Sequence, residues 1–325
     1  MMPVDAVNDA REDELAELDR ALESLRTEIR SRFPAGPRPS SSFGVPALVS
    51  IFSELRQRLA TFGMHEQPGD VDEFGMDEVA LRRARPLLEL LFDTWWRVEV
   101  KGLERLPPTG PCLLAANRSG LVPYDGLMLA NAVARFDPRG LRPAFMVDDR
   151  MAALPFVQPY LARLGGVRAC SDNARRLLGS GRRVIAFPEG ARGATKLFRE
   201  RYRLQRFARG GVVRVALQTQ APLVPVGVVG AEEAHPVLFK THGTARAVGF
   251  SFLPVTPTFP LLGPLGLVPF PTKWTMRFGE PLELRELPPD AEHDELLVSR
   301  LTEQLRSRVQ ELVDRALSDR ESVWD

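Results

Sequence analysis

Two short segments hold most of the residues in this chain that could do chemistry. Residues 116–125 read Ala-Asn-Arg-Ser-Gly-Leu-Val-Pro-Tyr-Asp, and residues 187–193 read Phe-Pro-Glu-Gly-Ala-Arg-Gly. In the first segment Arg118 stands seven residues before Asp125. A guanidinium stays protonated at any working pH and only donates hydrogen bonds, so Arg118 could hold an oxyanion or a phosphate but could not accept a proton. We therefore expect Asp125 to form an ion pair with Arg118 rather than to orient a general base.

The second segment lies in a strongly basic stretch of a chain whose net charge is only +1. Residues 182–214 contain ten basic and two acidic residues, whereas residues 1–33 contain nine acidic and five basic ones. A basic field of this size favours an anionic partner, such as a lipid headgroup, the phosphates of coenzyme A or a nucleic acid. No nucleic-acid-binding motif is recognisable here, so nucleic acid ranks last. The alternative interpretation is a solvated, charged face of a helix.

The elements that position these residues alternate between strands and helices from Arg97 onward. Apolar runs predict strands, amphipathic stretches predict helices between them, and this alternation is typical of an α/β fold with a mixed, largely parallel sheet flanked by helices. The predicted strands are 97–100, 112–116, 143–147, 183–187, 223–229 and 273–278. The predicted helices are 125–136, 152–164, 173–180, 207–219 and 291–317, preceded by helical stretches at 9–33, 46–62 and 77–96. The fold therefore has helical extensions at both ends.

Several motifs follow one another in the order found in one enzyme family. They are Pro111–Asn117, Leu164–Val167 with Asn173 and Ala174, Phe187–Gly190 with Arg192 and Lys196, and Val224–Val226. Residues 85–290 thus resemble the lysophospholipid and glycerol-phosphate acyltransferases, a family of membrane-associated enzymes. This resemblance implies transfer of an acyl group from acyl-CoA or acyl-carrier protein to a lysophospholipid, a glycerol phosphate or a similar lipid alcohol. No cofactor beyond the acyl donor is implied, and no metal-ligand pattern is visible.

The resemblance also implies roles for individual residues. In this family a His held by an Asp removes the proton from the acceptor hydroxyl, because such a hydroxyl is a poor nucleophile without a base. By this resemblance the catalytic pair is Asp125 and Arg118. The substrate-binding residues that it implies are Asn117, Ser119, Glu189, Gly190, Arg192, Lys196 and Pro225. Basic side chains and backbone amides at the Phe187–Gly190 turn would hold the phosphate of the acceptor.

The chain departs from the family pattern at its most important position. The catalytic His would fall at 118, or at 120 with the commoner family spacing, and these positions hold Arg118 and Gly120. The second motif has Ser171 where an acceptor-binding Arg is usual, with Arg168 close by. An inactive family member that binds lipid or acyl thioester, or that supports an active partner, is therefore the alternative function.

Other groups could act as the base. His235 follows the fourth motif, and His242 lies in a predicted turn, whereas His65 and His293 lie in polar surroundings. A lone His is more often a surface or capping residue than a catalytic one. Asp125 itself could serve if burial raised its pKa, but a neighbouring guanidinium acts in the opposite direction.

The domain organisation is predicted from the ends of the helical patterns and from the Pro/Ser-rich stretch between them. We predict an amphipathic helix at 1–33, a Pro/Ser-rich linker at 34–45, a helical lead-in at 46–84, an acyltransferase-like domain at 85–290 and a C-terminal helix at 291–325. Leucines at heptad spacing allow self-association through the first helix, but two heptads make a weak coiled coil, so docking on the body is favoured. Cys112 and Cys170 are too few for a disulfide framework, and both are expected to be reduced thiols in apolar surroundings, in a cytosolic compartment.

Two apolar stretches raise the question of membrane contact. The first ends in Trp95 and Trp96, which suit either a bilayer interface or a buried core. The second, residues 247–272, is uncharged and contains six prolines, so it cannot be a spanning helix. We expect a partly buried extended segment whose tip, residues 261–268, contacts lipid or covers the active cleft. These features predict a peripheral protein on the cytoplasmic face of a membrane, with lipid and an anionic membrane surface as partners. Acyl-carrier protein is a further candidate partner, which the family resemblance implies.

Overall fold

The computed structural model describes residues 71–324 apart from 121, 138–141, 153–156, 208–209, 242–252, 260, 262–265, 267, 283, 285–286 and 289. The chain divides into two compact units, residues 1–90 and 91–325. The predicted helices 9–33 and 46–62 and the linker 34–45 lie outside the described residues. The predicted domain boundaries therefore stay predictions, and the account below concerns mainly residues 91–324.

The predicted helix 77–96 consists of two helical forms. Helix α3 spans Glu78–Glu89 and begins after Asp77, whose carboxylate accepts hydrogen bonds from the amides of Val79 and Ala80. Pro86 lies inside α3, and the chain continues as a π-helix, η1, over Leu90–Trp95. Proline supplies no amide donor, so Pro86 interrupts the helical ladder in the turn that precedes it.

A seven-stranded mixed sheet forms the centre of the second unit, in the order β1-β9-β6-β2-β5-β3-β4. Strands β2, β3, β4, β5 and β6 run parallel to one another, β9 runs antiparallel to β6, and β1 is parallel to β9. The strands are β1 Glu99–Lys101, β2 Leu113–Ala116, β3 Ala144–Val147, β4 Gly166–Arg168, β5 Val184–Ala186, β6 Leu223–Val229 and β9 Thr275–Phe278. Every residue of β2, β3, β5 and β6 is buried, as expected for parallel strands covered on both faces. The predicted α/β fold class is confirmed.

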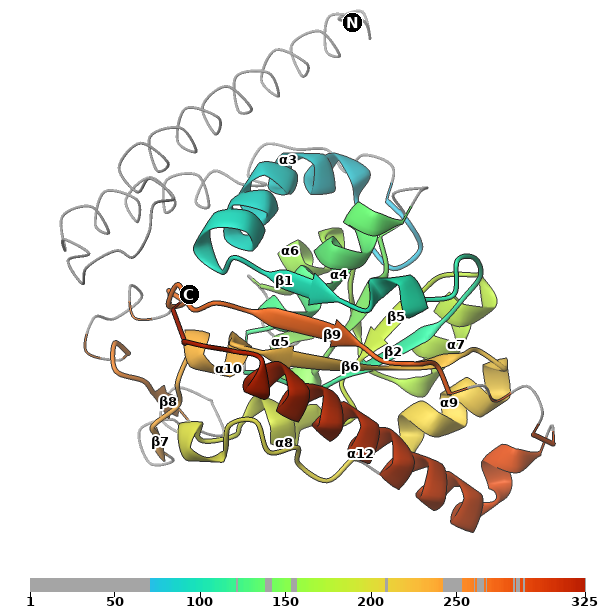
Figure 1. Cartoon of the computed structure of the whole chain (residues 1–325). Coiled ribbons are helices and arrows are strands. Elements are labelled where there is room, and N and C mark those ends of the chain that lie inside the picture. The colour runs from blue at the N-terminus through green and yellow to red at the C-terminus, as the bar shows by residue number, and fades with distance from the viewer. Residues whose placement is uncertain are drawn as a thin grey trace, which may run out of the picture. The chain divides into compact units, whose positions relative to one another are not determined.

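Helices cover both faces of this sheet (Figure 1). Helices α4 (Tyr124–Phe136) and α6 (Gln158–Arg163) lie on one face, and α7 (Ser171–Gly179), α9 (Gly211–Thr219) and α12 (Glu295–Ser318) lie on the other. Short helical segments complete the unit: η2 Leu103–Arg105, α5 Asp149–Ala152, α8 Gly190–Ala194, η3 Phe198–Glu200, α10 Ala231–Ala234 and η5 Ala291–His293. A separate two-stranded sheet pairs β7 (Phe239–Thr241) with β8 (Leu253–Val255) in antiparallel fashion.

Three of the predicted elements need correction. The predicted helix 152–164 is two helices, α5 and α6, separated by residues outside the described part. The predicted helix 207–219 begins only at Gly211, because Gly210 has a left-handed backbone (φ 65°). The C-terminal helix begins at Glu295, where the Asp294 carboxylate caps the amides of Leu296 and Leu297. Strands β4, β7 and β8 were not predicted, because they lack the continuous apolar run that marked the equally short β5.

The tryptophans at the end of η1 help to close the core. Trp96 is fully buried and stacks on Trp274, with ring centroids 4.4 Å apart. The indole nitrogens of Trp95 and Trp96 donate to the carbonyl oxygens of Pro269 and Phe270. For Trp96 the core interpretation is therefore the right one. None of the helices described here is both long enough and apolar enough to cross a bilayer.

The two cysteines are free thiols in different surroundings. Cys112 is buried just before β2, and burial raises its pKa to about 12. Cys170 is exposed, and its sulfur caps α7 by accepting a hydrogen bond from the amide of Asn173 at 3.5 Å. The two thiols thus differ in burial: Cys112 lies in the core, whereas Cys170 lies at the start of α7, two residues after β4.

Candidate functional site

The predicted motifs meet at the carboxyl edge of the parallel strands. Asn117, Arg118 and Ser119 follow β2, the Phe187–Gly190 turn follows β5, and Glu232 lies in α10 directly after β6. Because β2 lies between β5 and β6, the topology brings these three connections together although they are up to 115 residues apart in the chain. Ligands of open α/β sheets bind at this edge.

Arg118 and Asp125 form a buried ion pair at this edge. The distance between Arg118 Nη1 and Asp125 Oδ1 is 2.8 Å, and the two side chains are 3% and 0% exposed. The Arg118 guanidinium also lies over the Phe187 ring, 4.8 Å from its centroid, which adds a cation–π contact. The predicted pairing of Asp125 with Arg118 is confirmed.

All acceptor positions of the Asp125 carboxylate are occupied. Oδ1 accepts from Arg118 Nη1 and from the Gly126 amide at 2.8 Å, and Oδ2 accepts from both the amide and the hydroxyl of Ser119 at 2.9 Å. A carboxylate offers about four acceptor sites. Asp125 is therefore committed to the Arg118–Ser119 segment and to the first turn of α4, and it has no site left for a substrate proton or for an imidazole.

Glu189, the glutamate of the second motif segment, connects two backbone segments through its carboxylate. Glu189 is buried and its Oε1 accepts the Arg118 amide at 2.8 Å, while its Oε2 accepts the Gln205 amide at 2.7 Å. Gly193 lies between these residues, since a Cβ atom there would come within 2.7 Å of the Cβ atoms of both Arg118 and Glu189. Glu189 thus positions Arg118 from inside the protein.

Lys196 completes a buried charge cluster behind this site. Its Nζ lies 2.6 Å from Glu232 Oε1 and 3.3 Å from Glu189 Oε2. Burial lowers the pKa of Lys196, but the carboxylates of Glu232 and Glu189 outweigh that effect and hold the pKa above its ordinary value. Burial also raises the pKa of Glu232, with Lys196 acting in the opposite direction. Glu232 Oε2 in turn accepts the Tyr202 amide at 2.7 Å, so the cluster ties β6 to the segment after η3.

The remaining predicted site residues have varied surroundings. The Asn117 side chain is fully buried and exchanges two hydrogen bonds with the backbone of Val228, at 2.9 and 2.7 Å, so it links β2 to β6. Pro225 lies within β6, paired with Ala115 of β2. Gly190 has φ +55° and lines a pocket, whereas Arg192 is exposed on α8. Ser119 lines a second, shallower depression.

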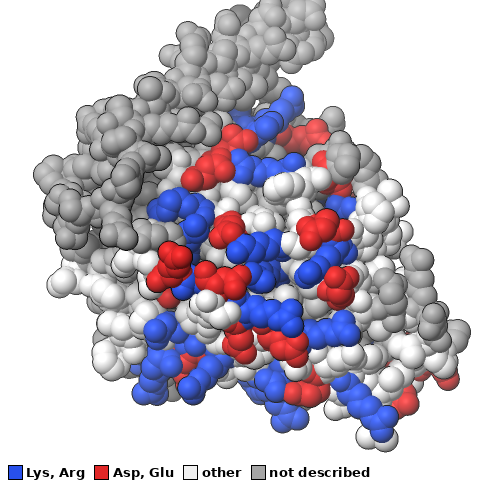
Figure 2. Space-filling view, viewed as in Figure 1, with Lys and Arg blue, Asp and Glu red and all other residues white. Residues whose placement is uncertain are grey.

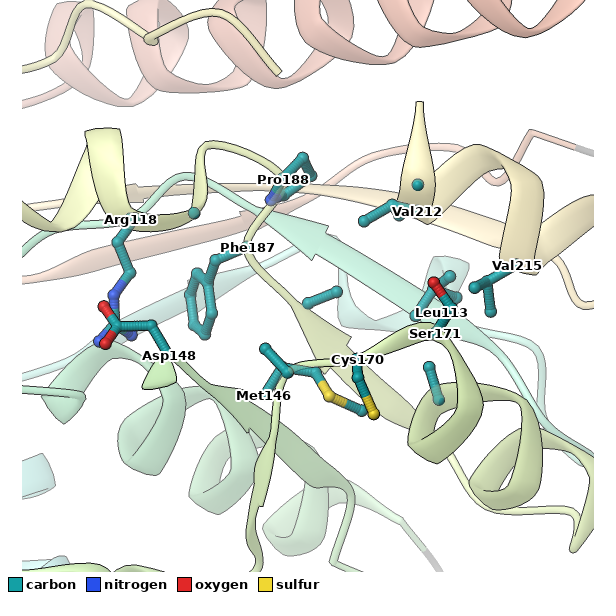
Figure 3. A pocket seen from close by; sticks show the side chains of 15 residues that line it. Leu113, Arg118, Met146, Asp148, Cys170, Ser171, Phe187, Pro188, Val212 and Val215 are labelled. Atoms are coloured by element: carbon teal, nitrogen blue, oxygen red, sulfur yellow. The ribbon is translucent and has the colours of Figure 1, made fainter. Parts of the chain in front are cut away.

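The pocket beside Arg118 has a volume of about 210 Å³ and lies between the strand ends and helices α7 and α9. Figure 3 shows Arg118 and Asp148 at one side of it, Phe187 in the middle, and Val215 and Ser171 at the other side. Most of its wall is apolar, formed by Leu113, Met146, Ala169, Ala174, Ala186, Pro188 and Val212 among others. Such a wall suits a hydrocarbon chain, with polar groups confined to the ends.

Sequence reasoning missed several residues of this pocket, three of which lie in or after strands β3 and β4. Asp148 follows β3, Cys170 follows β4, and Met146 lies within β3. Their position after predicted or short parallel strands was the available signal, because the carboxyl ends of parallel strands share one edge. The unrecognised β4 concealed Cys170. In the part of the chain that the structure describes, no group of three or more His, Cys, Asp or Glu side chains could hold a metal ion.

A second, smaller depression has Ser119 in its wall. It is lined by Ser119, Lys196, Arg201, Glu232 and His235, among others. The His235 ring stacks on that of Tyr124, with centroids 5.7 Å apart and an interplanar angle of 3°. His235 thus reaches the neighbourhood of the first motif, which its position in the sequence did not establish.

Comparison with known proteins agrees with the motifs. A family model described as "Acyltransferase" matches residues 97–229, which include both segments of the site. An uncharacterized protein of Mycobacterium tuberculosis strain H37Rv is 39% identical over 319 residues, covering 94% of this chain and 87% of that protein.

The chain belongs to the acyltransferase family. An uncharacterized protein of Mycobacterium leprae strain TN is 42% identical to this family member over 278 residues, or 84% of this chain and 76% of that protein. Among solved structures, the 1-acyl-sn-glycerophosphate (LPA) acyltransferase PlsC of Thermotoga maritima is 19% identical, with 85% of this chain and 93% of that chain covered and a TM-score of 0.47.

Proposed function

We propose that this acyltransferase family member binds the acyl chain of a thioester or lysolipid in the pocket beside Arg118 and does not transfer it by the family's base-catalysed reaction. The observation that carries this proposal is the buried Arg118–Asp125 ion pair. Arg118 cannot accept a proton, and all four acceptor positions of Asp125 are filled by protein donors. The first motif therefore lacks the base that would activate an acceptor hydroxyl.

The pocket supports the choice of ligand. Its wall is largely apolar, which favours burial of methylene groups at roughly 0.8 kcal/mol each. The Arg118 guanidinium stands at one end, where it could donate to a carbonyl or carboxylate oxygen of the ligand. The donor would be acyl-CoA or acyl-carrier protein, and the lipid partner a lysophospholipid, a glycerol phosphate or a similar alcohol.

Filling the pocket tests this proposal. Gly211 lines the pocket, and a Cβ atom there would meet no heavy atom within 4 Å, so Gly211→Phe should enter open space. The loss of burial of two methylene groups should weaken acyl-CoA binding about tenfold in titration calorimetry. Gly179→Phe is the matched control, since Gly179 ends α7, has equally open surroundings and does not line the pocket. Equal affinities of the two variants would contradict the assignment of the pocket.

A second candidate function is acyl transfer with His235 as the base. It is favoured by one observation, the place of His235 beside Tyr124 and on the rim that also holds Ser119. In this version the acceptor hydroxyl would approach from the shallow depression. Acceptor-dependent release of free thiol from acyl-CoA that disappears in His235→Ala and survives in His293→Ala would establish it, because His293 is exposed and lies outside the site.

A further inference from the structure

Exposed apolar side chains gather around the β7–β8 hairpin. Leu238 and Phe239 are 41% and 68% exposed, and Leu261, in the segment after β8, is 85% exposed. Elsewhere in the described residues, large exposed apolar side chains stand singly, at Val71, Phe136, Leu296 and Trp324. An exposed Phe beside two exposed leucines is unfavourable in water and marks a contact surface.

Arginines stand next to this apolar group. The amide of Phe198 in η3 donates to the carbonyl of Val237, immediately before Leu238, at 2.8 Å. Arg199 and Arg201 are both exposed, and the Arg201 guanidinium lies over the Phe198 ring, 4.3 Å from its centroid. Figure 2 shows Lys and Arg side chains clustered in the region where Figure 1 places α8 and the hairpin, beside uncharged side chains.

These arginines are not neutralised by the protein around them. Among the described residues, no carboxylate forms an ion pair with Arg199 or Arg201. The neighbouring Glu200 uses its carboxylate to accept the Leu197 amide at 3.2 Å. Two exposed arginines without an ion-pair partner in the described part of the chain therefore lie near the apolar side chains, and they fit an anionic partner.

We propose that Leu238, Phe239 and Leu261, with Arg199 and Arg201, form a docking surface for an anionic lipid bilayer. Apolar side chains would enter the boundary between headgroups and acyl chains while the guanidinium groups bind lipid phosphates. We choose a bilayer over a protein because exposed apolar side chains and exposed arginines occur together here, which is the combination that an anionic membrane surface accommodates. This proposal is independent of whether the protein turns over substrate.

Docking in this manner would also orient the candidate site. Phe198, Arg201 and Val237 belong both to this neighbourhood and to the shallow depression that contains Ser119 and His235. A docked molecule would therefore present that depression to the lipid headgroups. The phosphate of a lysolipid could then reach Arg201 without leaving the membrane surface.

Vesicle binding of the full-length chain tests the surface. Wild type should co-sediment with phosphatidylcholine vesicles that contain phosphatidylglycerol, and much less with pure phosphatidylcholine or at high salt. Each arginine near a charged surface contributes about fivefold to partitioning, so the double variant Arg199→Gln, Arg201→Gln should bind about 25-fold more weakly. Phe239→Ser should lower binding about tenfold, because the ring no longer leaves water.

Matched controls come from α12, where the same changes can be made away from the hairpin. Leu296 is 71% exposed, and Arg300 and Arg315 are exposed. Leu296→Ser and the double variant Arg300→Gln, Arg315→Gln should bind vesicles like wild type, and all variants should retain the wild-type melting temperature. Equal losses in both sets would overturn the proposal. The proposal would also be overturned if the wild-type protein did not bind vesicles, or if Phe239 proved to mediate self-association instead of vesicle binding.

Discussion

The buried ion pair predicts a large loss of stability when its anion is removed. Asp125→Asn keeps the shape of the side chain but removes the charge that faces Arg118 Nη1 at 2.8 Å. It also turns an amide NH₂ toward at least one of the donors now bound by the carboxylate, which are supplied by Ser119, Gly126 and Arg118. Breaking a buried pair by removing one partner typically costs about 3–5 kcal/mol. We expect a loss in that range for Asp125→Asn.

A double-mutant cycle isolates the pair itself. Arg118→Met removes the cation and leaves the Asp125 carboxylate with the Ser119 and Gly126 donors. The double variant should be less destabilised than the sum of the single variants, with a coupling energy of about 2 kcal/mol or more. Urea unfolding followed by tryptophan fluorescence suits the measurement. Trp96 is fully buried and its ring centroid lies 5.3 Å from that of Tyr124, the residue before Asp125.

The outcome of this cycle has a direct consequence for the proposed function. Additive losses, or a loss below about 1 kcal/mol for Asp125→Asn, would mean that the two side chains do not hold each other in solution. Asp125 would then be available to orient a base, and the argument that the first motif lacks one would fail.

Four further predictions follow from the same contacts. Arg118→His should create or raise acyltransferase activity measured as acceptor-dependent thiol release, because an imidazole at position 118 could be held by Asp125; an unchanged rate in a well-folded variant would count against position 118 as the vacated base site. Gly193→Ala should lower the melting temperature in calorimetry, since the new Cβ would lie 2.7 Å from those of Arg118 and Glu189, whereas Gly179→Ala, in open surroundings, should not. The pKa of Lys196 in the folded protein lies above its ordinary value of 10.5. The contribution of Lys196 to stability should therefore be complete below pH 10.5 and be lost as the pH rises through the pKa of the folded state. Lys196→Met should abolish this loss of stability at alkaline pH, measured by urea unfolding at a series of pH values. Cys170 should react with a thiol reagent in the native protein and Cys112 only after unfolding, because Cys112 is buried with a pKa of about 12; modification of both at equal rates would contradict the packing before β2.

Much of this fold can be predicted from the sequence, because long apolar strands carry a clear signal. The strands that flank the site, β2, β5 and β6, were expected within one or two residues of their observed bounds. The charged run from Lys196 to Arg214 was harder, since a solvated helical face and a surface for an anionic partner were both open interpretations. In the structure it begins in a buried cluster, passes through η3, continues without regular structure and ends in α9. The reason is that Lys196 is paired with Glu232 of α10 and with Glu189 of the turn after β5, contacts that no local pattern encodes.

In the candidate site, too, some contacts could be predicted from the sequence and others could not. The pairing of Arg118 with Asp125 was expected from the family resemblance and from the opposite charges of the two side chains, and it is confirmed. The inward position of Glu189, its bond to the Arg118 amide and the neighbouring His235 could not be predicted, because they depend on how the connections after β2, β5 and β6 meet. Which of the predicted residues touch substrate stays a prediction.

The measurement that tests the central claim most directly is thiol release from acyl-CoA by the purified full-length protein. The assay would use vesicles containing phosphatidylglycerol, a panel of lysophospholipids and glycerol 3-phosphate, with acyl-CoA binding measured in parallel. We predict saturable binding of acyl-CoA that Gly211→Phe weakens, and no release of thiol above the rate without acceptor. Clear acceptor-dependent release by wild type would contradict the account, and its loss in His235→Ala would identify the base.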